Sequence, residues 1–175
     1  MHNKLTQKLH IKSLASSGKF TGYASVFNNI DSYNDVVLPG AFKNTNSQDV
    51  KLLWQHDPKA ILGKIDTLQE TQYGLLIEAE LFTDIQQGQE VYKLMQRGVL
   101  DGLSIGYGIL EEFFEDGLRY IKDLKLWEIS LVTFPANEHA RVINLKDDEK
   151  KLLEAMEQGI KVLRGSLKSI DFRQM

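Results

Sequence analysis

The sequence predicts a mainly β protein with flanking helices, built around a roughly seven-stranded antiparallel barrel and followed by a C-terminal helix. Short segments of alternating apolar and polar residues, separated by frequent turn signals, fill the chain up to about residue 145. One helical pattern interrupts them, and a charged, helix-prone stretch replaces them after residue 146. Many short strands favour a closed or nearly closed sheet. We therefore expect one unit over residues 1–145 and a helical tail over 146–175.

Seven segments carry the strand pattern, at residues 5–14, 19–27, 49–56, 61–68, 74–82, 102–113 and 118–134. The first two are separated by Ser16, Ser17 and Gly18, which is a hairpin signal. The alternation is clearest in residues 74–82, which place four apolar side chains on one face: Leu75, Ile77, Ala79 and Leu81. The last strand is long enough that we expect it to be bent or interrupted.

Two helices are expected outside these strands. The internal one is capped by Thr83 or Asp84 and ends before Gly98. Its apolar side is formed by Ile85, Val91, Leu94 and Met95. The tail carries a coiled-coil-like seam with steps of three and four residues, at Leu153, Met156, Ile160, Leu163, Leu167 and Ile170. This short seam is compatible with docking on its own domain, with pairing to a second copy, or with pairing to another protein.

The bulk composition is that of an ordinary soluble globular protein, with 42% hydrophobic and 26% charged residues. A net charge of −3 gives no overall reason to expect nucleic-acid binding. The chain has no cysteine, which excludes disulfides and thiolate metal sites. No apolar run approaches the roughly 18 residues that a membrane span needs, and the N-terminus lacks the apolar core of a signal peptide.

A serine in the sequence GLSIG raises the question of a catalytic nucleophile. Ser104 formally matches the G-x-S-x-G motif of esterases, which requires a strand, a sharp turn and then a helix. The residues after Ser104 are instead β-prone, so a strand is the better interpretation. Alternation puts Ser104, Gly106 and Gly108 on one face, and the two glycines predict an open strip where an extended substrate could lie. A bulge or a barrel corner would explain the same pattern.

A serine nucleophile needs a base within hydrogen-bond reach. His56 ends the strand KLLWQH, and Pro58 is expected to stop that strand. Glu128 lies in the apolar strand LKLWEISLV, on the same face as Ser130. A buried carboxylate needs a partner, which could be a histidine or an arginine. From the residues alone, a plain salt bridge and an orienting role for Glu128 remain equally open.

Other sites lack support in the sequence. No phosphate-binding glycine motif or H-E-x-x-H motif is present, so we expect no cofactor and no metal. Asp31 and Asp35 lack the remaining residues of a calcium loop. They are interpreted as turn residues that accept hydrogen bonds from nearby amides.

Four segments occur in an order that resembles the prohead (capsid maturation) serine protease family of tailed bacteriophages: GYASVFNNIDSYNDVVLPGAF, LLWQHDPKAILGKI, GVLDGLSIGYGI and LKLWEISLVTFPANEHARV. The resemblance runs from about residue 22 to residue 142. It implies that the unit at 1–145 is a protease domain, distantly similar in fold to the herpesvirus assemblins. Those proteins have a seven-stranded barrel wrapped by helices.

The resemblance also implies roles for individual residues. Ser104 would be the nucleophile, His56 the general base and Glu128 the acid that orients it. His139 is the alternative third member, because the herpesvirus enzymes use a second histidine there. For the oxyanion we expect backbone amides in the turn at Ala136 and Asn137, because it directly follows the Glu128 strand.

As a family member the chain would be a serine endopeptidase that cleaves the phage scaffold and major capsid protein, and also itself. It would act inside the assembling procapsid in the cytoplasm of the host bacterium. A homodimer or a partner of the tail helix is compatible with this reading, and neither nucleic acid nor membrane is implied. Two alternatives remain: a non-catalytic assembly factor with a protease-like fold, and a small esterase. The sequence leaves open whether this is a precursor or a self-processed form.

Overall fold

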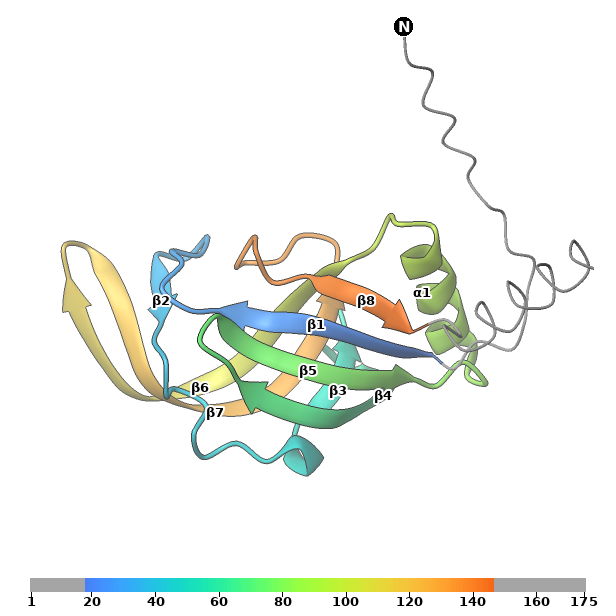
Figure 1. The fold of residues 1–175 in the computed structure, drawn as a ribbon, viewed down its shortest axis with the longest axis horizontal. Coiled ribbons are helices and arrows are strands. Elements are labelled where there is room, and N and C mark those ends of the chain that lie inside the picture. The colour runs from blue at the N-terminus through green and yellow to red at the C-terminus, as the bar shows by residue number, and fades with distance from the viewer. Residues whose placement is uncertain (1–17, 147–175) are drawn as a thin grey trace, which may run out of the picture.

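The structure is a computed structural model, and it describes residues 18–146. Over these residues the chain forms a single curled sheet with one helix at one end (Figure 1). The elements are β1 (Lys19–Val26), β2 (Asp35–Val37), a 3-10 turn (Ser47–Asp49), β3 (Lys51–Trp54), β4 (Asp57–Glu70), β5 (Gly74–Leu81), α1 (Gln86–Gln96), β6 (Gly102–Glu115), β7 (Leu118–Val132) and β8 (Val142–Lys146). The strand expected at residues 5–14 and the tail helix expected after residue 146 lie outside the described residues.

The sheet is mixed rather than antiparallel. Its strand order is β2-β7-β3-β4-β5-β1-β8, and β6 pairs with β7. Both β2 and β3 run parallel to β7, and the remaining pairs are antiparallel. The prediction of a purely antiparallel barrel was therefore wrong. Alternation along a strand tells which face is buried but not which strand lies beside it, and a parallel pair requires a long crossover connection.

The sheet curls around one apolar core as a half-barrel. An isolated bridge connects the two edges of the curled sheet, because it joins Gly102 at the start of β6 to Arg141 just before β8. The predicted inward face of β5 is confirmed, because Leu75, Ile77, Ala79 and Leu81 are at most 2% exposed. Ile129 and Leu131 of β7 reach the same core and are fully buried. The core therefore fixes β7, which carries one of the candidate site residues.

Helix α1 closes one end of the core with Val91, Tyr92 and Met95. Its N-cap is Ile85, with no side-chain cap, so the expected caps Thr83 and Asp84 were wrong. At the other end, Gly98 has φ +67°, the left-handed conformation expected just after a helix. The expected apolar residues Ile85 and Leu94 are partly exposed.

Two strands were not predicted. β2 lies in a segment that reads as a polar loop, and three residues are too few to show an alternation. β8 follows the turn PANEHAR and pairs with β1. Both are short strands whose position depends on a long neighbour, β7 or β1, rather than on local propensity.

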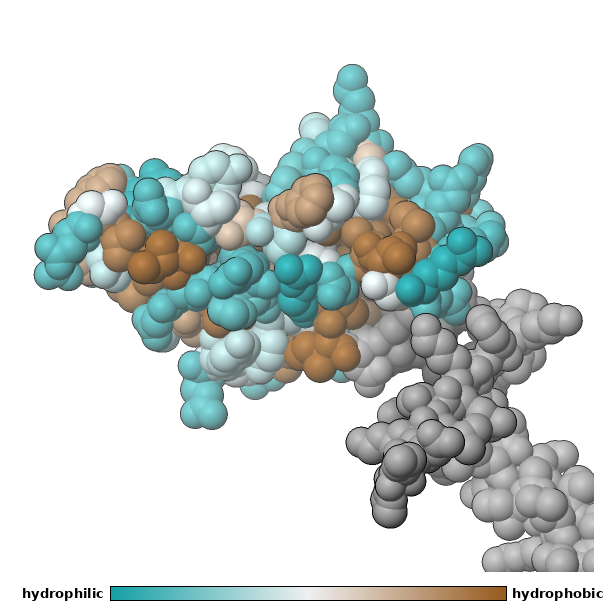
Figure 2. All heavy atoms as spheres, turned by 90° about the horizontal axis from the view of Figure 1, so that it is seen from above, coloured by the Kyte–Doolittle hydropathy of each residue, from teal (hydrophilic) through white to brown (hydrophobic). Residues whose placement is uncertain are grey.

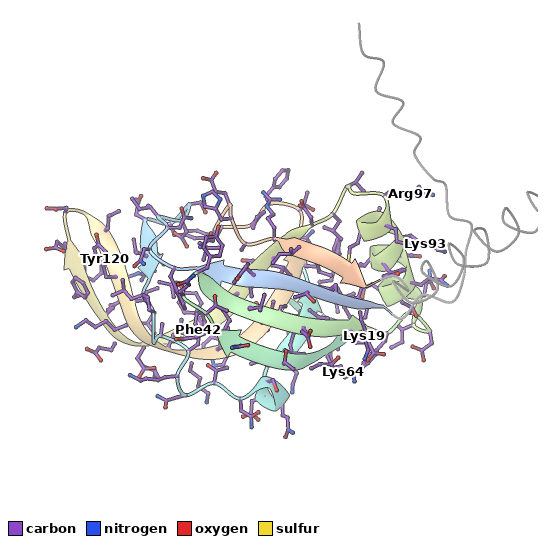
Figure 3. All side chains as sticks on the ribbon, in the orientation of Figure 1. Lys19, Phe42, Lys64, Lys93, Arg97 and Tyr120 are labelled. Atoms are coloured by element: carbon purple, nitrogen blue, oxygen red, sulfur yellow. The ribbon has the colours of Figure 1, made fainter. Side chains whose placement is uncertain are left out.

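The β6–β7 hairpin projects beyond the body of the sheet (Figure 1). On it, Tyr120 stacks on Phe113 with ring centroids 4.8 Å apart (Figure 3). Figure 2 shows a mostly polar surface with separate apolar patches, one of them toward this projecting end. Leu110 and Phe114 of the hairpin are 63% and 70% exposed. Within residues 18–146, no helix has the length and apolar character of a membrane span.

Candidate active site

His56 is held in a tight turn between β3 and β4. β3 ends at Trp54, β4 begins at Asp57, and the two residues between them, Gln55 and His56, have φ of 50° and 61°. Two successive positive φ values are typical of a two-residue type I′ hairpin turn, whose twist matches that of the flanking strands. Glycine or asparagine usually occupies these two positions. Pro58 lies inside β4, so the prediction that proline ends the strand was wrong. The turn itself ends β3.

Hydrogen bonds to β7 maintain this unusual turn. Gln55 N donates to Leu131 O at 3.1 Å, and its side-chain amide donates to Thr133 Oγ1 at 2.8 Å. His56 N donates to Ser130 Oγ at 3.0 Å. Backbone strain of this kind persists only where the surroundings over-determine the conformation. The parallel pairing of β3 with β7 therefore decides where the imidazole lies.

The His56 imidazole is paired with a nearly buried carboxylate. His56 Nδ1 and Glu128 Oε1 are 2.6 Å apart, and the two side chains are 45% and 12% exposed. This hydrogen bond and the negative charge of Glu128 raise the pKa of His56 above its ordinary value, and partial burial opposes them. With Nδ1–H donating to the carboxylate, Nε2 of the neutral ring is left as an acceptor.

Ser130 is a member of this cluster that the sequence analysis did not single out. Its hydroxyl is fully buried, donates to Glu128 Oε2 at 2.7 Å and accepts from His56 N. It thus fixes both the carboxylate and the turn that carries the imidazole. The sequence contains a signal for this role of Ser130, because the alternation of the strand places Ser130 on the same face as Glu128.

Ser104 lies on the same face of the sheet as this pair. In the antiparallel register, Ser104 is opposite Ser130 and Gly106 is opposite Glu128. Directly opposed residues project to one face, so Ser104 neighbours the Ser130–Glu128 pair. β6 continues as a strand to Glu115, so no helix directly follows Ser104. The esterase-type nucleophile elbow is therefore excluded.

The glycines after Ser104 have a different role from the open strip expected. A Cβ atom on Gly106 would collide with Glu128 Oε1 and lie 2.8 Å from its Cδ. On Gly108, a Cβ atom would lie 2.9 Å from the Trp127 ring. Both glycines make room for side chains of β7. They do not leave a groove on that face.

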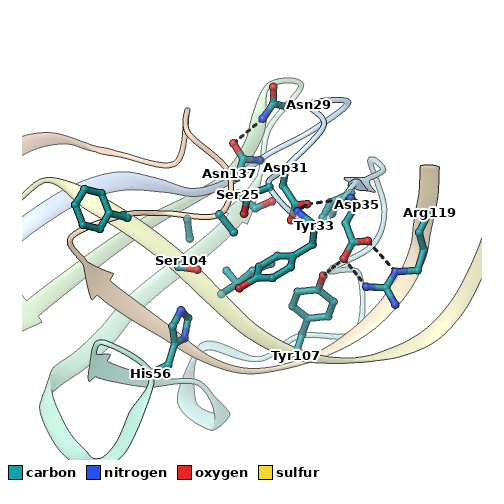
Figure 4. A pocket seen from close by; sticks show the side chains of 16 residues that line it. Ser25, Asn29, Asp31, Tyr33, Asp35, His56, Ser104, Tyr107, Arg119 and Asn137 are labelled. Carbon is teal, nitrogen blue, oxygen red and sulfur yellow. Dashed lines mark hydrogen bonds and ion pairs between the residues drawn. The ribbon is translucent and has the colours of Figure 1, made fainter. Parts of the chain in front are cut away.

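A pocket of about 420 Å³ contains Ser104 and His56 (Figure 4). Its walls come from β1, from β6 and from the loops around residues 29–33 and 134–137. Ser104 Oγ donates to no other described residue, so its hydroxyl is available in this pocket. Two aromatic side chains, Tyr33 and Phe134, line the pocket and are 74% and 91% exposed, which places them at its mouth.

The turn at Ala136 and Asn137 also lines the pocket. Asn137 braces it, since its Nδ2 donates to Val26 O at 2.9 Å and its Oδ1 accepts from Asn29 Nδ2 at 3.1 Å (Figure 4). Ala136 O accepts from Ser32 N at 3.0 Å. Neither backbone N–H of Ala136 and Asn137 donates to another residue of the described chain. These bonds anchor the turn, and its two N–H groups without an acceptor among the described residues lie beside the pocket.

An ion pair forms the far end of the pocket. Arg119 makes two hydrogen bonds to the buried carboxylate of Asp35, at 2.8 and 2.6 Å, and Tyr107 Oη donates to Asp35 Oδ2 at 3.2 Å. Burial is the main cause that raises the pKa of Tyr107. Asp31 accepts from the amides of Tyr33 and Asp35, as expected of a turn residue. The expectation that Asp35 is a turn residue was wrong, because its side chain is an ion-pair partner.

The structure brings Ser104, His56 and Glu128 together and leaves His139 apart. The His139 side chain is 54% exposed and lies near Glu138, and His139 does not line the pocket. Within residues 18–146, no three His, Asp or Glu side chains converge in a way that could hold a metal ion. The pocket thus holds a hydroxyl and an imidazole, and the imidazole is paired with a carboxylate. That set of groups can perform nucleophilic acyl transfer.

Comparison with known proteins places the chain among phage proteins. The chain is 37% identical over 136 residues to the prohead protease of Enterobacteria phage HK97, covering 74% of this chain and 60% of that protein. It is 30% identical over 141 residues to the prohead protease of Escherichia phage T5, covering 74% of this chain and 66% of that protein. The chain therefore spans about two thirds or less of these relatives' length.

A longer relative and a solved structure were also found. A capsid polyprotein of Pseudomonas phage PAJU2 is 31% identical over 173 residues, covering 91% of this chain and 24% of the polyprotein. The KSHV protease in complex with a hexapeptide phosphonate inhibitor aligns with a TM-score of 0.49 and 12% identity, covering 71% of this chain and 63% of that one. The family model of the caudovirus prohead serine proteases matches residues 7–157. This chain belongs to the caudovirus prohead serine protease family.

Proposed function

We propose that this chain is a serine endopeptidase that cleaves the major capsid protein of a tailed phage during prohead maturation. The observation that carries the proposal is the 2.6 Å contact between His56 Nδ1 and Glu128 Oε1, with the imidazole sharing a pocket with Ser104. A histidine held in this way can accept the serine proton. The family membership supports a peptide bond as the target.

In the proposed reaction, Ser104 Oγ attacks the carbonyl carbon of a peptide bond as its proton moves to His56 Nε2. Glu128 holds the ring by its Nδ1–H and stabilises the imidazolium that forms. The tetrahedral intermediate then collapses, the C–N bond breaks, and His56 gives the proton to the leaving amine. Water repeats the cycle on the acyl-enzyme with His56 again as the base, which releases the second product and restores Ser104.

The developing negative charge on the carbonyl oxygen needs donors that are already in place. In the proposal these are the backbone N–H groups of Ala136 and Asn137. Ala136 and Asn137 line the same pocket as Ser104. The Asn137 side chain anchors the turn, because its Nδ2 donates to Val26 O of β1 and its Oδ1 accepts from Asn29 Nδ2. Both backbone N–H groups remain available because the described chain offers them no acceptor.

The similarity to phage prohead proteases and to a capsid polyprotein supports a wider role in capsid maturation. The scaffold protein and the chain itself would be further substrates, and cleavage would take place inside the procapsid in the host cytoplasm. The capsid polyprotein of phage PAJU2 contains a segment similar to this chain, which supports a link to capsid assembly. A homodimer, or a partner bound by the residues after 146, is part of the same hypothesis.

The decisive experiment is the intact mass of the major capsid protein after co-expression with the wild-type chain, with Ser104→Ala, or with His56→Ala. Truncation only by wild type is expected, with turnover reduced roughly 10⁴- to 10⁶-fold in either variant. Truncation by the Ser104→Ala variant as well would place the nucleophile elsewhere. Intact capsid protein beside folded wild type would favour the non-catalytic assembly factor.

A further inference from the structure

We propose that Ser25 selects the substrate side chain next to the cleaved bond, through a hydrogen bond between its hydroxyl and the polar end of that side chain. This rests on the function proposed above and makes Ser25 a specificity-determining residue of the same pocket. The ligand class is a peptide residue with an apolar stem and a hydrogen-bonding end group. The carbonyl carbon of that residue would be the one that Ser104 attacks.

Ser25 is a buried polar residue whose side chain has no partner within the protein. It is 2% exposed, and its hydroxyl forms no hydrogen bond with a described residue. The fully enclosed side-chain polar atoms without a partner among residues 18–146 are Tyr92 Oη and Asp123 Oδ1. Ser25 Oγ is not one of them, so the small exposed part of Ser25 includes its hydroxyl. Because Ser25 lines the pocket, a ligand reaches this hydroxyl from there.

A β-bulge in β1 turns Ser25 into the pocket. Tyr23 is opposite Leu76 and Ser25 is opposite Leu75, so Ala24 is an extra residue in this strand. Successive residues of a regular strand point to opposite faces, yet Ala24 and Ser25 are both buried and both line the pocket. Bulges re-aim side chains in this way beside active sites. The backbone of β1 thus presents the Ser25 hydroxyl to the space that holds Ser104.

Apolar side chains also line this pocket. Ala24 and Val37 belong to the hydrophobic core, and Ile105 packs against it. Ser25 on β1 and Ser104 on β6 face the same pocket from separate strands (Figure 4). When Ser104 attacks a peptide carbonyl, the side chain of that same residue is the one nearest the nucleophile. Its apolar stem would pack against these apolar side chains, and its polar end would meet the Ser25 hydroxyl.

Such a site discriminates by a penalty as well as by attraction. A desolvated hydroxyl without a partner costs free energy, and a polar side chain that bonds to it removes that cost. An apolar side chain of the same size would leave the Ser25 hydroxyl unpaired in a dry contact. The expected preference for the polar side chain is about tenfold or more.

The first test is the identity of the residue before the cleavage point. Mass spectrometry of the products formed by the wild-type chain from the capsid protein identifies this residue. A side chain with a hydrogen-bonding end group is expected. Glycine, alanine or another apolar residue at that position would overturn the proposal. Absence of any cleavage would instead count against the proposed function.

The second test measures the preference with two capsid peptides that differ only at this position. One carries the natural residue and the other its nearest apolar isostere, such as Met for Gln or Val for Thr. Wild type is expected to favour the natural peptide in kcat/KM by about tenfold or more, and Ser25→Ala to lose most of that preference. Because the preference is a ratio measured within one variant, a general loss of activity cancels. An equal preference in wild type and Ser25→Ala would overturn the proposal.

Ser32→Ala is the matched control, because Ser32 also lines the pocket but is exposed. It is expected to keep the wild-type preference, and an equal loss in both variants would contradict a specific role of Ser25. Thermal unfolding adds a readout that a structural role would move in the opposite direction. Removal of an unpartnered hydroxyl from a buried site should leave the Tm unchanged or raise it. A Tm of Ser25→Ala clearly below wild type would mean that the hydroxyl bonds within the protein, which would also overturn the proposal.

Discussion

The Glu128 carboxylate occupies the space above Gly106, where any other residue would place its side chain. The two residues are opposite each other in the β6–β7 ladder, so the missing Cβ at residue 106 lets the carboxylate reach Nδ1 of His56. A glycine two positions after Ser104 thus belongs to the same arrangement as the histidine and the glutamate.

Gly106→Ala is expected to abolish most activity while the protein stays folded. The added methyl group would collide with Glu128 Oε1 and displace the carboxylate from His56. Gly108→Ala is the matched control, because its methyl group meets the Trp127 ring, which is half exposed and can move. Peptidase assays and circular dichroism on both variants check this. Equal activity in both would show that Glu128 does not need that space.

Glu128→Gln is expected to lower the pKa of His56 and to reduce kcat by roughly 10³- to 10⁴-fold. The hydrogen bond and negative charge of Glu128 are the causes that raise this pKa, and the amide removes the charge while keeping the shape. NMR titration of the His56 ring in wild type and variant measures the shift. An unchanged pKa would mean that the carboxylate does not govern the imidazole.

The pH dependence of activity is expected to follow the raised pKa of His56. The neutral ring accepts the serine proton, so kcat/KM should increase with a midpoint above the ordinary value of 6.5. The contribution of His56 to the free energy of unfolding changes with pH in the opposite direction. This contribution is fully present below the pKa that His56 has in the unfolded chain, and it is lost as the pH rises through the pKa of His56 in the folded protein. Kinetics and urea unfolding across pH 5–9 measure both, and a kinetic midpoint at or below 6.5 would be contrary to this.

Ser130→Ala is expected to lower the free energy of unfolding by about 1–3 kcal/mol and to reduce activity. The substitution removes the fully buried Ser130 hydroxyl, which is the common partner of Glu128 Oε2 and of the His56 N–H. Thr133→Ala is the control, because it removes only an exposed bond to Gln55 and should cost about 0.5 kcal/mol or less. Urea unfolding compares the two, and similar losses would argue against a special role for Ser130.

The ion pair at the far end of the pocket is expected to respond asymmetrically to substitution. Arg119→Met leaves the buried Asp35 carboxylate without its cation and should cost about 3 kcal/mol. Asp35→Asn should cost less, because the Arg119 side chain is 34% exposed and can be hydrated. Thermal unfolding of both variants tests this order. The reverse order would mean that the burial of Asp35 is compensated by other groups, such as Tyr107.

The candidate site could be predicted from the sequence where the signal is local. Alternation along residues 118–134 put Glu128 on one face with Ser130, and alternation along 102–113 put Ser104 on one face with Gly106. Both placements are confirmed by the register of β6 and β7. The same reasoning showed that side chains are missing at Gly106 and Gly108, but it could not show which residues of a neighbouring strand fill the space.

The features that could not be predicted depend on residues far apart in the chain. The Gln55–His56 turn contains neither glycine nor asparagine, and its conformation is imposed by hydrogen bonds that it donates to β7 and to Thr133 just after β7. The parallel pairings of β2 and β3 with β7 likewise have no local signature. Propensity and periodicity describe a segment by itself, so they do not report a conformation that its tertiary surroundings impose.

The separation of His56 from its partners also sets the order in which the site can assemble. Ser104, Glu128 and Ser130 lie on one hairpin, whereas His56 is 72 residues from Glu128 and 74 from Ser130. Long-range parallel pairing has a large loop-closure entropy to overcome and forms slowly compared with a hairpin. In a folding chain, the β6–β7 hairpin that carries Ser104 is therefore expected to form before His56 is brought to Glu128. Under the proposed function, Ser104 therefore has no general base until β3 has paired with β7, so peptidase activity would arise only once the sheet is complete.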